Sequence, residues 1–176
     1  MFSTFASFIT RPAPSTSIQV NRQSFGYWLA FAVLVVDHAT KFWVHEFTPY
    51  AWSQVVTGYF NLVHVYNLGA AFSFLADAGG WQRFFFVAVA LIASIWLIVI
   101  LRKPLDRMER LAYALILGGA LGNGLDRAVR GYVVDFLDFY WKNWHWPAFN
   151  IADISIVSGA ALLIFSSFRR QPAATA

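Results

Sequence analysis

The feature that most restricts the fold of this chain is an uncharged apolar run from Phe84 to Leu101. A helix needs about 20 mostly apolar residues to cross a bilayer, so this run alone predicts a transmembrane helix. Three further apolar segments interrupted by few charges are 25–45, 111–125 and 151–168. The chain is 59% hydrophobic and 12% charged, whereas soluble domains are roughly 45–50% apolar and about 25% charged. We therefore expect one membrane domain with four transmembrane helices.

The membrane domain is predicted to extend over residues 25–170. Residues 1–24 contain Pro12 and Pro14 among many Ser and Thr residues, which is typical of a disordered tail. They lack a compact apolar core followed by a small-residue cleavage site, so a cleaved signal peptide is not expected. Residues 171–176 are predicted to be a short C-terminal tail.

Positive charges predict the orientation of the helices, because Lys and Arg concentrate on the cytoplasmic side of membrane proteins. If both termini are cytoplasmic, that side holds most of the basic residues: Arg11, Arg22, Arg102, Lys103, Arg107, Arg110, Arg169 and Arg170. The outer side then holds fewer: Arg83, Arg127, Arg130 and Lys142. We therefore expect both termini, including the 1–24 tail, in the cytoplasm.

The first outer segment contains a part at about 54–75 that is predicted to be rich in β-structure. Val55–Tyr66 is rich in β-branched and aromatic residues, which favours strands. In Asn67–Leu75, Gly69 and two alanines permit close approach of another backbone. A short sheet here could offer backbone groups to an extended peptide. The second outer segment, 128–149, is assigned no strand, and its tryptophans suit the membrane interface.

Two charged residues, Asp37 and Lys41, interrupt the first apolar segment near its outer end. Their i, i+4 spacing places them on one face of a helix, where they can pair. An ionised group at mid-membrane costs about 2.5–3.5 kcal/mol even on insertion scales. The pair is therefore either a structural ion pair that lowers this cost or a polar floor beneath an active site.

Asp135 and Asp153 are the candidate catalytic pair. Asp135 is flanked by apolar residues in VVDFLDF, and Asp153 opens the last apolar segment after Asn150. Two nearby carboxyl groups cannot both ionise cheaply, so one keeps a proton. The ionised member can accept a proton from water while the protonated member polarises a scissile carbonyl. This pattern predicts peptide hydrolysis without a covalent intermediate, with Asp153 as the base.

Each of these acidic residues also has a structural interpretation. Asn150 and Asp153 have the spacing of a capping box, and a helix N-terminus favours an ionised carboxylate in either case. Asp138 is expected to be an ordinary solvated residue. Asp126 and Arg127 could pair with each other or position a substrate; mainly structural roles are expected, with Arg127 tying the end of the third helix to its neighbours.

Other kinds of site are disfavoured by the residues present. The chain has no cysteine, which excludes disulfides, thiolate metal ligands and a thiol nucleophile. Its four histidines have no metal-binding spacing, and Ser73 and Ser155 lack the context of a nucleophile elbow. No basic face is dense enough for nucleic acid. A small transporter or a noncatalytic peptide-binding scaffold remain alternatives, but the first predicts charges spread through the bilayer and the second leaves the carboxylate pair unexplained.

Five ordered motifs resemble the signal peptidase II family, the bacterial lipoprotein signal peptidases. They are DHATK at 37–41, NLGAAFSF at 67–74, GNGLDR at 122–127, VVDF at 133–136 and FNIAD at 149–153. The resemblance covers about residues 25–168. One departure is His38, where the family usually has Gln.

The resemblance implies an aspartic endopeptidase of the bacterial inner membrane with its active site toward the periplasm. Its substrates would be lipidated prolipoproteins, cut just before a diacylglyceryl-modified cysteine, with membrane lipid as the other partner. Asp135 and Asp153 match the catalytic pair. Supporting or substrate-binding residues by the same match are Asp37, Lys41, Asn67, Gly69, Asn123, Asp126, Arg127 and Asn150.

The implied fold is an all-α membrane protein of four transmembrane helices with a small periplasmic β-cradle. No metal and no organic cofactor are expected, and the protein is expected to act as a monomer.

Overall fold

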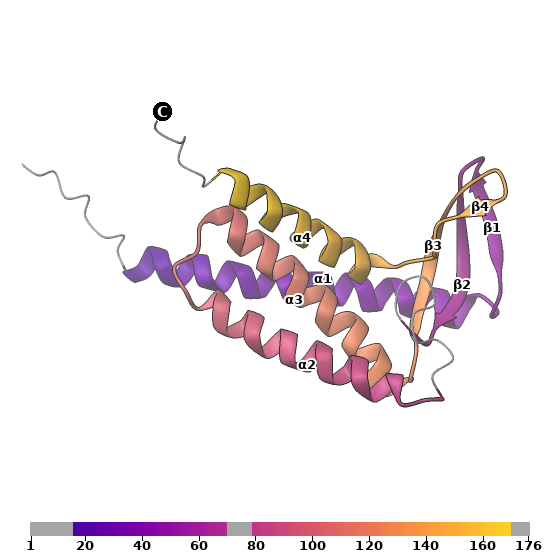
Figure 1. The fold of residues 1–176 in the computed structure, drawn as a ribbon, viewed down its shortest axis with the longest axis horizontal. Helices are drawn as coiled ribbons and strands as arrows, with labels where there is room; N and C mark the ends of the chain where they lie inside the picture. Colours follow the sequence, from indigo (N-terminus) through magenta and orange to yellow (C-terminus); the bar gives the residue numbers. More distant parts are fainter. Residues whose placement is uncertain (1–15, 70–78, 170–176) are drawn as a thin grey trace, which may run out of the picture.

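The computed structural model describes residues 16–69 and 79–169, with side chains from Ser24 onward. Three parts of the predictions lie outside the described residues. They are the tail up to residue 15, residues 70–75 of the outer β-segment, which include Ser73, and the C-terminal tail. The described residues form four helices and one four-stranded sheet. Figure 1 shows the helices side by side and the sheet at one end of the bundle, opposite the end where α1 begins and α4 finishes.

The helices agree with the four apolar segments but are longer at several ends: α1 Thr16–Phe47, α2 Gln82–Leu101, α3 Arg107–Val129 and α4 Ile151–Arg169. The prediction of a disordered segment is wrong for residues 16–24, which are the first turns of α1. No proline follows Pro14 before the apolar segment begins, so nothing in this stretch breaks a helix. At α3, Asp106 and Glu109 form a capping box that starts the helix before the apolar run.

Helix α3 is the centre of the bundle, because it packs against each of the other three helices. Its glycines permit these contacts, as expected. A Cβ atom added at Gly119 would overlap the carbonyl oxygen of Ala152 in α4, and one added at Gly122 would lie 2.5 Å from a carboxylate oxygen of Asp37 in α1. Small residues on α3 therefore bring α1 and α4 close enough for polar groups on all three helices to meet.

The sheet is larger than predicted. Strands β1 Ser53–Thr57 and β2 Phe60–Asn67 confirm the expected β-segment, and the segment assigned no strand contains β3 Val133–Trp141 and β4 Trp144–His145. All neighbours are antiparallel in the order β1-β2-β3-β4. The run VVDFLDFYW is rich in β-branched and aromatic residues, which favours a strand. Because β3 pairs with β2, it places Asp135 beside the end of β2.

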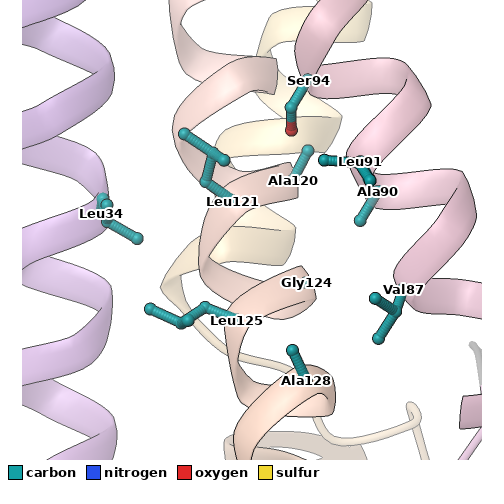
Figure 2. Close-up of a pocket in the computed structure, with 10 residues that line it drawn as sticks. All are labelled: Leu34, Val87, Ala90, Leu91, Ser94, Ala120, Leu121, Gly124, Leu125 and Ala128. Carbon is teal, nitrogen blue, oxygen red and sulfur yellow. The ribbon is translucent and has the colours of Figure 1, made fainter. Parts of the chain in front are cut away.

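Helices α1 and α2 both pack on α3 but scarcely contact each other. Figure 2 shows the resulting cavity, which has a volume of about 240 Å³ and is lined by Leu34 of α1, the Val87–Ser94 face of α2 and the Ala120–Ala128 face of α3. Ser94 is the polar side chain among the labelled residues, and it is 2% exposed. None of the lining residues belongs to the predicted site, so the cavity marks where α1 and α2 diverge.

Candidate active site

Asp135 lies in β3 with its side chain almost fully buried at 2% exposure. Both of its carboxylate oxygens accept hydrogen bonds from amide side chains. Asn67, the last residue of β2, donates Nδ2 to Oδ2 at 3.0 Å, and Asn150 donates Nδ2 to Oδ1 at 2.6 Å. Two amides from separate segments therefore hold this carboxyl group in one orientation.

Asp153 lies in the first turn of α4, where the predicted capping box is confirmed. Its backbone N–H donates to Asn150 Oδ1 at 3.1 Å, and its Oδ2 accepts from the backbone N–H of Asn150 at 3.1 Å. Its other oxygen, Oδ1, accepts from Asn123 Nδ2 of α3 at 2.8 Å. A cap alone does not require this third bond, so Asp153 both caps α4 and belongs to a polar network that reaches α3.

Asn150 connects the two aspartates. Its side chain is fully buried, donates to the carboxylate of Asp135 and accepts from the backbone of Asp153. Because one amide side chain contacts both residues, β3 and the start of α4 bring Asp135 and Asp153 into one site. Asp135 and Asp153 are distant in the sequence, and the short segment that links β4 to α4 brings them together.

The surroundings of Asp135 raise its pKa from 3.8 to about 7. Burial is the largest cause, because a buried carboxylate loses its hydration, and the negative charge of Asp153 adds to it. The hydrogen bonds from Asn67 and Asn150 act in the opposite direction. Near neutral pH the Asp135 carboxyl group therefore carries a proton for a large fraction of the time, as a general acid must.

A group of buried charges lies beside this pair. Lys41 Nζ is 2.7 Å from Asp37 Oδ2 and 2.9 Å from Asp126 Oδ2, and all three side chains are at most 1% exposed. The predicted pairing of Asp37 with Lys41 is confirmed. Asp126 pairs with Lys41 and with Arg130, at 2.6 Å, instead of with Arg127. His38, which departs from the family motif, lies next to this group and leaves the Lys41 contact intact.

Arg127 ties the end of α3 to its neighbours, as predicted. Its Nη2 donates to the carbonyl oxygen of Gly69 at 2.6 Å, and its guanidinium lies 5.0 Å from the ring centre of Phe86 in α2. Gly69 in turn donates its N–H to Asn67 Oδ1 at 3.1 Å. Because Asn67 contacts Asp135, Arg127 and Gly69 support the Asp135 side of the site.

The prediction that Asp138 is a solvated residue is wrong. Asp138 is 6% exposed, accepts from Asn61 Nδ2 at 2.9 Å and lies 2.9 Å from His145 Nδ1 of β4. Strand pairing, which the sequence did not predict here, brings these partners to Asp138, since β2 and β4 are the two neighbours of β3 in the sheet.

Comparison with known proteins decides the family. Residues 29–169 match the family model described as "Signal peptidase (SPase) II". The chain belongs to the signal peptidase II family. A lipoprotein signal peptidase of Serratia marcescens is 52% identical over 139 residues, covering 79% of this chain and 82% of its own. One of Cupriavidus necator is 54% identical over 146 residues, with 81% and 83% covered.

A solved structure has the same fold. It is titled "Bacterial membrane enzyme structure by the in meso method", and it matches with a TM-score of 0.75 and 28% identity over 87% of this chain and 95% of its own. The family resemblance noted from the five motifs is thus confirmed over most of the chain. Every predicted site residue lies in the matched region.

One part of the site in this signal peptidase II family member was not predicted. An apolar cavity of about 430 Å³ adjoins Asp153 and is lined mainly by Trp146, Phe149, Ile154 and Val157. The sequence assigned the tryptophans to the membrane interface, which is a general signal and does not reveal that Trp146 forms a wall next to Asp153. Only the turn of the chain between β4 and α4 brings the two together.

Proposed function

We propose that this protein is an aspartic endopeptidase in which Asp135 and Asp153 form the catalytic pair. As a member of the signal peptidase II family, it removes signal peptides from prolipoproteins. The aspartic chemistry is supported by one observation above all: Asn150 links two carboxyl groups, one of which has a pKa raised to about 7.

The proposed reaction uses the two carboxyl groups in different protonation states. Asp153, ionised, accepts a proton from a water molecule whose oxygen attacks the scissile carbonyl carbon. Asp135, protonated, donates its proton to the carbonyl oxygen as the tetrahedral intermediate forms. When the carbon–nitrogen bond breaks, Asp153 gives its proton to the leaving amine and the hydroxyl proton returns to Asp135. Both groups then have their starting protonation.

The cavity beside Asp153 is the feature that favours a lipid-modified substrate. Its walls are aromatic and aliphatic, apart from Asp153 and Ser158. An apolar modification on the residue next to the scissile bond would bury surface there, at roughly 25 cal/mol per Å² removed from water. We therefore expect cleavage just before a diacylglyceryl-modified cysteine.

The proposed setting is the bacterial inner membrane, crossed by all four helices, with the sheet on the periplasmic side. Helices α2 and α4 are long and apolar enough to cross a bilayer, and large side chains such as Phe84, Ile92, Val157 and Phe168 are more than 60% exposed. The charges of α1 and α3 pair with one another inside the bundle, which lowers their cost in lipid.

Orientation can be tested with cysteines, because the chain has none of its own. A cysteine at Asn143, in the β3–β4 turn, should react with an impermeant thiol reagent added outside intact cells. A cysteine at Lys103, between α2 and α3, should resist it until the membrane is opened. Labelling of Lys103→Cys but not Asn143→Cys would place the site on the cytoplasmic side.

The activity can be tested with the purified protein and one prolipoprotein in two forms, with and without the diacylglyceryl group. Only the lipidated form should be cut, at the bond before the modified cysteine, and Asp153→Asn should abolish the cut. Equal cleavage of both forms would contradict the lipid requirement. Full activity of Asp153→Asn would contradict the aspartic mechanism.

A further inference from the structure

The buried ammonium group of Lys41 makes one contact that its charge does not require. Lys41 is fully buried, and its Nζ lies within 2.9 Å of three oxygens, those of Asp37, Asp126 and Asn123. An ammonium group has three N–H donors and no acceptor, so each donor has one oxygen to face. The contact with Asn123 is a neutral amide, not a counter-ion.

The charges nearby balance without that amide. Asp37 and Asp126 carry two negative charges, and Lys41 and Arg130 supply two positive charges at 2.6–2.9 Å. Buried ions need partners of opposite sign, and this requirement is already met. The hydrogen bond from Lys41 Nζ to Asn123 Oδ1, at 2.9 Å, satisfies the third N–H donor of the ammonium group, and it also acts on Asn123.

That effect is to fix which way the amide of Asn123 points. An ammonium group can only donate, so it accepts the oxygen end of the amide and excludes the nitrogen end. Asn150 Nδ2, at 3.3 Å, also donates to Asn123 Oδ1. With its oxygen held by two donors, Asn123 directs Nδ2 to Asp153 Oδ1 at 2.8 Å. The reverse orientation would place the amide oxygen against a carboxylate oxygen.

We propose that Lys41 is a positioning residue for Asp153: it holds the Asn123 amide with its N–H toward the Asp153 carboxylate and so stabilises the negative charge that the base needs. This inference rests on the proposed function, in which Asp153 is the base. The positive charge of Lys41 polarises the amide it contacts, which strengthens the hydrogen bond on the other side of that amide. Lys41 itself does not contact the reacting atoms.

Removal of Lys41 alone would leave two buried carboxylates with too few partners, so the variant must keep the charges balanced. In Asp37→Asn/Lys41→Met one charge of each sign is lost, and Asp126 keeps Arg130. The amide oxygen of Asn at position 37 can still accept from the backbone N–H of Ala152, as Asp37 Oδ1 does at 2.8 Å. Asp37→Asn with Lys41 intact is the matched control.

We expect the kcat of Asp37→Asn/Lys41→Met on a lipidated prolipoprotein to be at least about tenfold below that of Asp37→Asn, because small displacements of a catalytic group are costly. KM should be similar in the two variants, since substrate does not contact Lys41. The acidic limb of the kcat pH profile should move to higher pH, because Asp153 has lost an oriented donor. A loss caused only by poorer folding would lower the active fraction without moving that limb.

Whether Lys41 acts through Asn123 can be tested by non-additivity. Asn123→Ala keeps the four charges of Asp37, Lys41, Asp126 and Arg130, and it should show the same loss of kcat and the same shift of the acidic limb. In the Asp37→Asn/Asn123→Ala background, adding Lys41→Met should change kcat by less than about threefold. A further large loss in that background, or an unshifted pH profile in Asn123→Ala, would overturn the proposal.

These outcomes differ from failure of the proposed function itself. If the unmodified protein does not cut the lipidated substrate, or Asp153→Asn retains activity, the aspartic mechanism is wrong. If the protein is active and depends on Asp153, but Asp37→Asn/Lys41→Met matches Asp37→Asn in both kcat and pH profile, only the role of Lys41 is wrong. Should the double variant fail to fold, an unshifted pH profile in Asn123→Ala would still overturn the role of Lys41.

Discussion

Asp135 and Asp138 lie three residues apart in the same strand and have nearly the same burial, 2% and 6% exposed. Each accepts a hydrogen bond from an asparagine of β2, Asn67 at 3.0 Å and Asn61 at 2.9 Å. Because their spacing is odd, they face opposite sides of the sheet. Asp135 contacts Asn150 at the start of α4, and Asp138 contacts His145 of β4.

The two aspartates differ in their remaining neighbours. Asp135 meets Asn150 and the negative charge of Asp153, and its pKa is raised to about 7. Asp138 meets His145, a side chain that can carry a positive charge, at 2.9 Å. Burial and an amide partner are thus common to both residues, so they do not make an aspartate catalytic. The second carboxylate supplied by α4 is what separates the catalytic candidate from the structural one.

The largest expected difference between the two is in turnover. Asp135→Asn removes a group that can donate and recover a proton, so kcat should fall by roughly a thousandfold or more. Asp138→Asn preserves an acceptor for Asn61 and does not alter the catalytic pair, so kcat should stay within about threefold of the unmodified protein. Turnover of a lipidated prolipoprotein in detergent measures both. Similar losses in the two variants would remove the distinction between the two faces of β3.

Substitution of Asp135 and Asp153 together tests whether the two carboxyl groups act as one unit. Asp135→Asn/Asp153→Asn should be little worse than either single change, because residues that act as one unit have strongly non-additive effects on catalysis. Asp135→Asn/Asp138→Asn should instead show the product of its single effects. Additive losses for Asp135 and Asp153 would mean that the two carboxyl groups do not work together.

Local sequence predicts the proposed catalytic pair but not this contrast. The order of the five motifs and the apolar flanks of Asp135 favour this pair, and the helices followed from long apolar runs. Asp138 has almost the same flanks, yet its partners Asn61 and His145 are defined only by strand pairing. Burial of a polar residue depends on which distant segments cover it, and the strands β3 and β4 were not predicted.

Helix ends were hard to predict for a related reason. Apolar runs indicate where a helix is buried in lipid or in the bundle, whereas its ends depend on caps and breakers. The polar start of α1 at Thr16 and the capping box of α3 at Asp106 and Glu109 extend these helices beyond their apolar parts. The orientation of the Asn123 amide is even harder to predict from the sequence, because three helices must pack before Lys41, Asn123 and Asp153 can meet.

The second largest effect concerns stability and pH. The pKa of Asp135 is about 7 in the folded protein and 3.8 as the reference value, so the folded state binds more protons between these values. The free energy of unfolding therefore falls as pH rises from about 4 to about 7, by at most about 4 kcal/mol for this group. Asp135→Asn lacks this loss, so its stability relative to the unmodified protein should improve as pH rises.

The test requires only that the free energies of unfolding of the two proteins are compared in the same detergent. The free energy of unfolding of Asp135→Asn minus that of the unmodified protein should be larger at pH 8 than at pH 4. Asn67 and Asn150 donate to different oxygens of Asp135, and Asp135→Asn replaces one of these acceptors with an NH2 donor. This lowers the stability of the variant at every pH but does not change the slope. A difference that does not vary with pH would show that Asp135 is not protonated in the folded state.

A smaller effect is expected on the other face of β3. Asp138→Ala leaves Asn61, which is 7% exposed, without its acceptor. An unsatisfied buried polar group costs about 1–3 kcal/mol, so the free energy of unfolding should fall by that amount. Asn61→Ala/Asp138→Ala should be less destabilised than the sum of the single variants, because both partners are then absent. Strict additivity would show that the hydrogen bond between Asn61 and Asp138 contributes little to stability.

The smallest expected effect is that of His145. Its side chain is 52% exposed, contacts Asp138 at 2.9 Å and stacks on the ring of Tyr140 with centroids 5.2 Å apart. Exposed ion pairs typically contribute about 0.2–1 kcal/mol, so His145→Gln should lower stability by no more than this, and the effect should shrink in high salt. Turnover should be unchanged, because His145 acts on the face of β3 that is turned away from Asp153. If His145→Gln instead reduced kcat or moved its pH profile, Asp138 would have to be coupled to the catalytic pair through β3, and the two faces of the strand could no longer be treated as independent.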